Sequence, residues 1–296
     1  MIKNLDTGVL YMLAAALISA LNGAMTKMLS VEISALEIVF FRNFIGIFLI
    51  LYAIKHTPVT LYGGKFHLLF MRGFFGFTAM ILFFYTIAVI PLGEAITLNK
   101  TSPFFVTLLA FFLLGERLSL RVAFALVLGF LGVVFIVKPF DMSFSYLHGI
   151  GIAGGFFAAA AYTTIKHIKD IYDSRIIVLS FVVVGTLLPL LLFIAAPYVD
   201  PPESLAFLFP AFVVPQSLYT WGLIAVMALV STLSQWLLTK AYSAKNLSIV
   251  GVISYTNIPF ALGFGWILGN AFPDILTFLG ISFIVAGGVL VSWRKN

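Results

Sequence analysis

Long apolar runs separated by short polar turns occupy the chain from beginning to end. The runs are about 20 residues long, the length that an α-helix needs to cross a hydrocarbon core of ~30 Å. They lack the ~10-residue alternation that is typical of transmembrane β-barrels. Ten spans are predicted, at 7–29, 35–54, 66–88, 92–114, 119–138, 147–168, 175–196, 219–240, 246–268 and 274–293. The pattern therefore predicts an all-α integral membrane protein with ten transmembrane helices.

Composition supports this class of protein and excludes others. Hydrophobic residues make up 62% of the chain and charged residues only 9%, whereas a soluble domain carries about a quarter charged residues. The sequence has no cysteine, which excludes disulfides, thiolate metal sites and thiol catalysis. The net charge of +6 does not indicate nucleic-acid binding, because the basic residues fall mostly in short turns that flank the membrane. The proline-rich stretch 197–217 predicts an interfacial loop or a short helix.

The distribution of lysine and arginine sets the predicted orientation. With the N-terminus inside, the cytoplasmic segments hold Lys3, Lys55, Lys65, Arg117, Arg121, Lys166, Lys169, Arg175, Lys240, Lys245, Arg294 and Lys295. The outer turns hold Lys138, and Lys27 lies just inside the outer end of the first span. Since basic residues concentrate on the cytoplasmic side, both termini are predicted to face the cytoplasm of a bacterial-type inner membrane.

The fourth span contains a polar interruption, Asn-Lys-Thr-Ser-Pro, from Asn99 to Pro103. A lysine at that depth, here Lys100, costs a few kcal/mol or more. Pro103 cannot donate to the helical ladder and leaves a carbonyl without its donor one turn back. An ionisable group beside a break in a spanning helix predicts a cavity or a pathway at this point.

The two halves of the chain resemble each other. Lys27 and Lys166 are 139 residues apart and both lie near the end of the first span of their half. Pro103 in the fourth span and Pro259 in the ninth, 156 apart, are each followed by an apolar run and a glycine. The long loop at 197–217 accounts for the difference between the two offsets.

This internal similarity predicts two five-helix repeats, 1–140 and 141–296. Five is an odd number, so the two repeats must have opposite membrane topology. Inverted repeats with matching broken helices typically place a binding site near the membrane midplane, between the halves.

Three motifs carry a resemblance to a known family: SPFFVTLLAFFLLGERLS at 102–119, FFRNFIG at 40–46, and Asn22-Gly23 followed by Lys27. Together with the ten spans, they resemble the ten-helix EamA-type members of the drug/metabolite transporter superfamily. The resemblance implies a helical bundle whose central cavity opens alternately to either side, and transport of small organic solutes. The second half departs from the pattern, with Asn270 where the first half has Glu116.

Depth along the spans suggests where such a solute would bind. Asn22, Arg42 and Lys100 each lie seven or eight residues from the outer end of a span, which places them roughly 10 Å below the outer surface. With Asn99 they are predicted to form the polar floor of an outward-opening vestibule, where two cations favour a solute with a carboxylate or phosphate. The alternative is that Glu37 or Glu94 neutralises them, or that backbone carbonyls cap them.

The second half supplies further candidates at depth. Tyr255 and Asn257 lie near the middle of the ninth span, and Gln235 and Tyr162 lie in the inner half. Each is a candidate substrate contact, although amides at depth often join helices to one another instead.

Four more positions are candidates for a gate or a hinge: Lys27, Pro103, Lys166 and Pro259. The two lysines have an alternative role in reaching the membrane interface, and Arg72, six residues into the third span, is expected to do the same on the inner side.

Enzymes and metal proteins are not supported. The histidines show no metal-ligand spacing, so no metal site is expected. No nucleophile–base pair lies at depth, and no nucleotide-binding motif or cofactor motif is present. The sequence thus predicts a secondary transporter of amino-acid-like solutes or organic anions, with the lipid bilayer and the solute as partners. A lipid-carrier flippase of the same fold is the alternative, and monomer and dimer both stay open.

Overall fold

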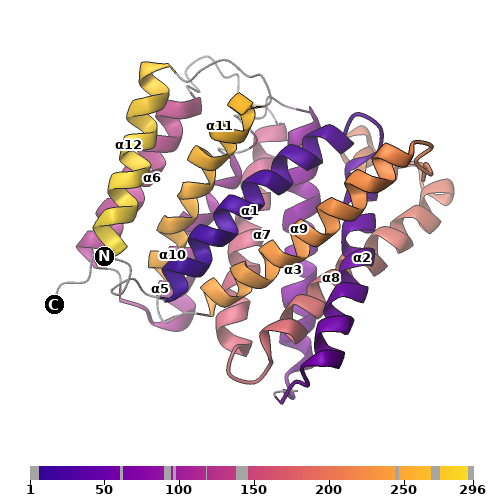
Figure 1. Cartoon of the computed structure of the whole chain (residues 1–296), viewed down its shortest axis with the longest axis horizontal. Coiled ribbons are helices and arrows are strands. Elements are labelled where there is room, and N and C mark those ends of the chain that lie inside the picture. The colour runs from indigo at the N-terminus through magenta and orange to yellow at the C-terminus, as the bar shows by residue number, and fades with distance from the viewer. Residues whose placement is uncertain are drawn as a thin grey trace.

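The computed structural model describes residues 7–60, 63–89, 95, 98–117, 119–137, 146–243, 247–267 and 274–292, and throughout these ranges the chain is a bundle of helices without β-strands (Figure 1). The helices are α1 (Thr7–Leu29), α2 (Ala35–His56), α3 (Phe66–Val89), α5 (Ser102–Leu114), α6 (Leu120–Val137), α7 (Tyr146–Ile168), α8 (Ser174–Ala195), α9 (Leu218–Tyr242), α10 (Leu247–Ile253), α11 (Asn257–Ile267) and α12 (Ile275–Ser292). Short 3-10 turns occupy Ala196–Tyr198, Glu203–Leu208 and Ser254–Thr256. The predicted all-α fold is confirmed.

Many of these helices have the dimensions of membrane spans. Within the described ranges, six stretches are long and apolar enough to cross a bilayer: Thr7–Leu29, Ala35–His56, Phe66–Val89, Ser174–Tyr198, Leu218–Tyr242 and Leu247–Phe264. Large apolar side chains such as Phe112 and Leu191 are exposed on the outside of the bundle, where lipid is the solvent that suits them. The chain is an integral membrane protein. The predicted start of the fourth span, 92–94, lies outside the described residues.

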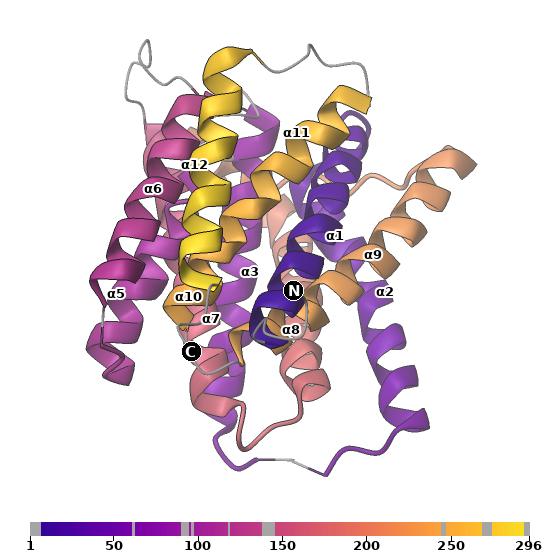
Figure 2. The same ribbon diagram turned by 60° about the vertical axis from the view of Figure 1, so that its left-hand side comes forward.

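Helices that are distant in sequence pack side by side. The principal pairs are α6 with α12, α3 with α7, α1 with α9, and α2 with α8; α5 packs on α7 and, less extensively, on α10. The α6–α12 pair forms one flank of the bundle, as both views show (Figures 1 and 2). Gly132 makes this approach possible, because a Cβ atom at that position would lie 2.6 Å from the carbonyl oxygen of Gly280.

The buried apolar residues form two clusters. One lies around α10 and includes Val106, Ile165 and Tyr255. The other lies around α2 and α8 and includes Leu36 and Phe181. The polar candidates described below lie within or between these clusters, so most of them are shielded from solvent.

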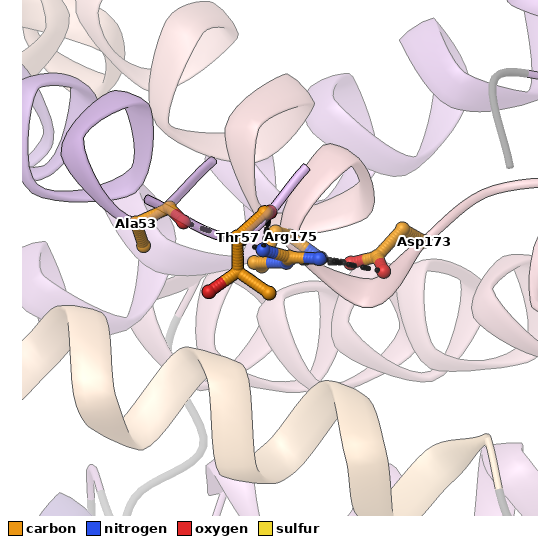
Figure 3. Close-up of polar contacts among 4 residues, drawn as sticks. All are labelled: Ala53, Thr57, Asp173 and Arg175. Carbon is orange, nitrogen blue, oxygen red and sulfur yellow. Dashed lines mark hydrogen bonds and ion pairs between the residues drawn. The ribbon is translucent and has the colours of Figure 1, made fainter. Parts of the chain in front are cut away.

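An ionic contact secures the junction between α2 and α8 (Figure 3). Asp173 is the N-cap of α8 and accepts a hydrogen bond from the backbone N–H of Arg175 at 2.8 Å. The Arg175 guanidinium lies between the Asp173 carboxylate, 3.0 Å away, and the carbonyl oxygens of Ala53 and Thr57 at the end of α2. Hydrogen bonding to Arg175 lowers the pKa of the Asp173 carboxyl below its usual value. The pair therefore satisfies backbone groups at the start of α8 and at the end of α2.

Candidate functional site

The ninth predicted span is broken in its middle. α10 ends at Ile253, a 3-10 turn covers Ser254–Thr256, and α11 begins at Asn257. Pro259 has no N–H to donate to the carbonyl four residues earlier, which accounts for the loss of regular helix just before it. The prediction of a proline-associated break is confirmed, and the break leaves backbone carbonyls available to other partners.

Lys100 occupies this break from the other half of the chain. It sits in the turn just before α5, its side chain is 9% exposed, and its Nζ donates to the carbonyl oxygen of Ser254 at 3.3 Å. Among the described residues, no carboxylate lies within ion-pairing distance of it. Glu94 lies outside those residues. A neutral carbonyl satisfies one donor and leaves the positive charge of Lys100 uncompensated by these neighbours.

Glu37 does not take the role of counterion that the alternative gave it. Its Oε2 accepts from the backbone N–H and the hydroxyl of Ser34, at 2.8 and 2.7 Å, and its Oε1 accepts from the backbone N–H of Val213 at 2.6 Å. Both oxygens are therefore used at the start of α2, and the carboxylate is 1% exposed.

Three tyrosines surround the break. Tyr242 of α9 interacts with Ser254 of the break, and its ring stacks on that of Tyr162 of α7 with 4.2 Å between centroids. Tyr255 is fully buried, and its hydroxyl has no hydrogen-bond partner within the described part of the chain. Of the two predicted candidates, Tyr255 directly follows Ser254 in the break and Tyr162 stacks on Tyr242, while Tyr242 itself was not anticipated from the sequence.

Arg72 of α3 is a further buried polar residue near these tyrosines, and it interacts electrostatically with Tyr162. Its Nη2 donates to Oε1 of Gln235 at 3.4 Å, and its guanidinium lies over the ring of Phe181, 4.8 Å from the centroid. The side chain is 1% exposed. The expectation that Arg72 reaches the membrane interface is therefore wrong. The available signal was a glycine one turn away, Gly76, where any Cβ would collide with the guanidinium.

Arg42 lies in a different environment from Lys100. Its Nη1 contacts the sulfur of Met80 at 2.9 Å, and its guanidinium lies 5.8 Å from the ring centroid of Phe84. The side chain is 5% exposed, and its Nε has no partner among the described residues. Arg42 and Lys100 share no direct contact, so the common polar floor that we expect from their depth stays a prediction.

The three asparagine candidates differ in their surroundings. Asn22 accepts a hydrogen bond from the hydroxyl of Ser231 at 2.6 Å, and Asn257 donates to the carbonyl oxygen of Ala16 at 2.8 Å. Both contacts join α1 to the second half, as expected for amides that link helices. Asn99 is partly buried beside Lys100.

The gate candidates, Lys27 and Lys166, lie in the last turns of α1 and α7, and the hinge candidates, Pro103 and Pro259, lie in the first turns of α5 and α11. Lys27 is exposed and donates to the carbonyl oxygen of Ile87 at the end of α3, at 3.1 Å. Lys166 is partly buried and interacts electrostatically with Glu116. These positions are compatible with gating, but the roles themselves stay predictions.

A groove of about 560 Å³ runs along the outside of α12. Its lining comes from one face of that helix and is apolar except for Ser282: Ile281, Ser282, Val285, Ala286, Val289 and Leu290. Among the described residues no cluster of three potential metal ligands occurs.

Comparison with known proteins gives three results. Residues 6–138 match the profile of the EamA-like transporter family. The chain is 35% identical to the pseudopaline exporter of Pseudomonas aeruginosa over 99% of this chain and 98% of that protein. It is 24% identical to the riboflavin transporter of Vibrio cholerae over 98% of this chain and 94% of that one.

One protein of known crystal structure shares the fold. It superposes with a TM-score of 0.76 at 16% identity, covering 96% of this chain and 95% of the other.

Proposed function

The chain belongs to the EamA-like transporter family, and from this premise we propose that it moves small organic metabolites across a bacterial inner membrane by alternating access. The observation that carries the proposal is the buried Lys100 at the meeting point of two broken spans, without a carboxylate partner among the described residues. Relatives named for cargo as different as pseudopaline and riboflavin support the transport of metabolites as a class.

The helix bounds support an inverted repeat of five spans in each half. Helices α1 and α7 end 139 residues apart, at Leu29 and Ile168. Helices α2 and α8 both have 22 residues and start at the same offset, 139. Helices α6 and α12 start 155 residues apart. Helices that match in order, at an offset of 139 before the long loop 196–217 and of 155 after it, are expected when two repeats share one architecture.

The packing supports the same symmetry. Exchanging the halves turns the α1–α9 contact into the α7–α3 contact, and the α2–α9 contact into the α8–α3 contact; all four are present. At the crossing of α2 and α8, a Cβ on Gly46 would meet Val182, and a Cβ on Gly185 would meet Asn43. These two contacts exchange under the offset of 139. A two-fold axis in the membrane plane accounts for both, and it implies ten spans with both termini on one side.

In the proposed mechanism, the two halves rock against each other around the breaks that precede Pro103 and Pro259. The solute's negative group binds the ammonium of Lys100, which exchanges its bond to the carbonyl of Ser254 for a stronger, charge-assisted one. Arg42 of α2, which contacts Met80 and Phe84 of α3, offers a second cation for the solute. Lys27 and Lys166 contact their neighbours differently as each side closes. The driving force is the gradient of the solute itself or exchange for another solute.

Reconstitution tests this proposal. The purified chain is first screened by thermal shift against amino acids, organic acids and phosphorylated metabolites, and the stabilising solute is then followed into proteoliposomes. We expect uptake above that of protein-free liposomes, and an affinity that Lys100→Ala weakens about tenfold or more. Lys55→Ala, which removes an exposed lysine at the end of α2, is the matched control and leaves affinity unchanged. Unchanged affinity in Lys100→Ala contradicts the role of Lys100, and absence of uptake by the wild type contradicts the function.

A further inference from the structure

Arg72 is a buried cation that has no charged partner among the described residues. Only Nη2 has a hydrogen-bond partner, the neutral amide oxygen of Gln235; Nε and Nη1 have none within the described part of the chain. No carboxylate there forms an ion pair with it, although its side chain is 1% exposed. Burying an unpaired charge costs several kcal/mol. The contact with the ring of Phe181 returns about 2 kcal/mol.

The packing around this guanidinium is specific to it. A Cβ at Gly76 would collide with both Nη1 of Arg72 and the ring of Phe181, so the absence of a side chain at Gly76 is what allows the cation to lie against the ring. Residues of three other helices converge on it: Tyr162 of α7, Phe181 of α8 and Gln235 of α9. An arginine that only filled the core would not need this convergence of polar and aromatic partners.

The same residues connect Arg72 to the proposed transport site. Tyr162, which interacts electrostatically with Arg72, stacks on Tyr242, and Tyr242 interacts with Ser254, whose carbonyl accepts from Lys100. Arg72 and Lys100 are therefore linked through a series of polar and aromatic neighbours, and no carboxylate from the described residues forms an ion pair with either of them.

We propose that Arg72 binds a carboxylate group of the transported solute, as an anion-binding position in addition to Lys100 and Arg42. A guanidinium presents a planar fork of donors that matches the geometry of a carboxylate, and here Nε and Nη1 carry the available donors. Gln235 and Phe181 hold the fork in place, and the stacked tyrosines form the wall between the two cations. This inference rests on the proposed function and adds that the cargo carries carboxylate chemistry recognised by Arg72.

The test measures binding to the full chain in lipid nanodiscs, at constant ionic strength, from the rise of the thermal midpoint with ligand concentration. The probes are succinate, its uncharged analogue succinamide, and inorganic phosphate. We expect succinate to stabilise the wild type and succinamide to have no effect. Arg72→Gln weakens succinate binding about ten- to a hundredfold, as for loss of a charged hydrogen-bonding partner. Arg72→Lys, which keeps the charge but loses the fork, gives an intermediate loss.

Two further variants separate binding from folding. Gln235→Leu keeps the charge of Arg72 but removes the amide that orients it, so it weakens succinate binding a few-fold. Arg175→Gln removes a cation already satisfied by Asp173, so it lowers the starting midpoint and leaves succinate binding unchanged. If Arg72→Gln lowers only the starting midpoint, Arg72 is structural and the inference is wrong. It is also wrong if the wild type responds only to phosphate, or to no anion.

The outcomes also separate this inference from the proposed function. Unchanged succinate binding in Arg72→Gln, together with weakened transport in Lys100→Ala, overturns the role of Arg72 alone. The reverse pattern supports Arg72 and overturns the role of Lys100.

Discussion

Replacing Glu37 by glutamine tests how the bundle is closed at the start of α2. The carboxylate is 1% exposed and accepts from three donors: the backbone N–H and hydroxyl of Ser34, and the backbone N–H of Val213. A carboxylate offers two acceptor oxygens, whereas an amide offers one oxygen and an NH₂ group. In Glu37→Gln one of the two backbone donors must therefore face another donor.

The expected loss follows from these contacts. A partly buried donor left without its charged partner costs about 2 kcal/mol, and removing a negative charge from the first turn of a helix costs up to ~1 kcal/mol more. Together they give about 3 kcal/mol, or roughly a hundredfold in the folding equilibrium. Ser34→Ala is the matched control, because it removes the capping hydroxyl, at about 1 kcal/mol, and leaves the bond to Val213 intact.

Two measurements distinguish the variants. Equilibrium unfolding in mixed micelles, followed by tryptophan fluorescence, gives the loss of stability. Limited digestion with chymotrypsin, which cleaves after aromatic residues, reports on the segment that Glu37 holds. Phe212 directly precedes Val213, and Phe209 lies four residues before it. We expect Glu37→Gln to speed cleavage there and Ser34→Ala to leave it unchanged. A loss below about 0.5 kcal/mol with unchanged cleavage would refute the assignment of Glu37 as the residue that holds this segment.

Two further predictions concern the edges of the bundle. Because Arg175 lowers the pKa of Asp173, the carboxylate's contribution to stability is complete above the ordinary aspartate pKa of about 4 and is lost as pH falls through the lowered value. The thermal midpoints of the wild type and Asp173→Asn should therefore differ at pH 7 and converge towards pH 3; a difference independent of pH would contradict this. Gly132→Ala places a methyl group 2.6 Å from the carbonyl of Gly280 and should destabilise by about 1–3 kcal/mol. Gly23→Ala, with nothing within 4 Å, should not destabilise, and equal thermal midpoints for the two variants would argue against close packing of α6 on α12.

Most of the architecture follows from hydropathy alone. The predicted span 7–29 coincides with α1, and the predicted start of the second span coincides with that of α2, at Ala35. The interruption of the ninth span was also predictable, since Pro259 removes a donor wherever it stands in a helix. The sequence did not place the break itself, which lies at Ser254–Thr256, three residues and more before the proline.

The candidate site was predictable only in part. Lys100, Tyr162 and Gln235 were identified from their depth, and the structure brings each of them to the series of polar and aromatic neighbours between the broken spans and α3. Tyr242 was missed, since a tyrosine near the end of a span is typical of interfacial anchoring. Arg72 was misjudged for a similar reason, because an arginine six residues into a span is able to extend to the interface.

The sequence by itself determined that the chain crosses a membrane, where it does so, and that a lysine lies at depth beside a broken helix. These are properties of transfer from water to hydrocarbon, which depend on composition and run length along one dimension. Which side chains meet at that lysine was decided by the tertiary structure. A helix must rotate about its axis and cross its neighbours before Arg72 turns towards Phe181 and Gln235 instead of the interface, and no one-dimensional pattern specifies that rotation.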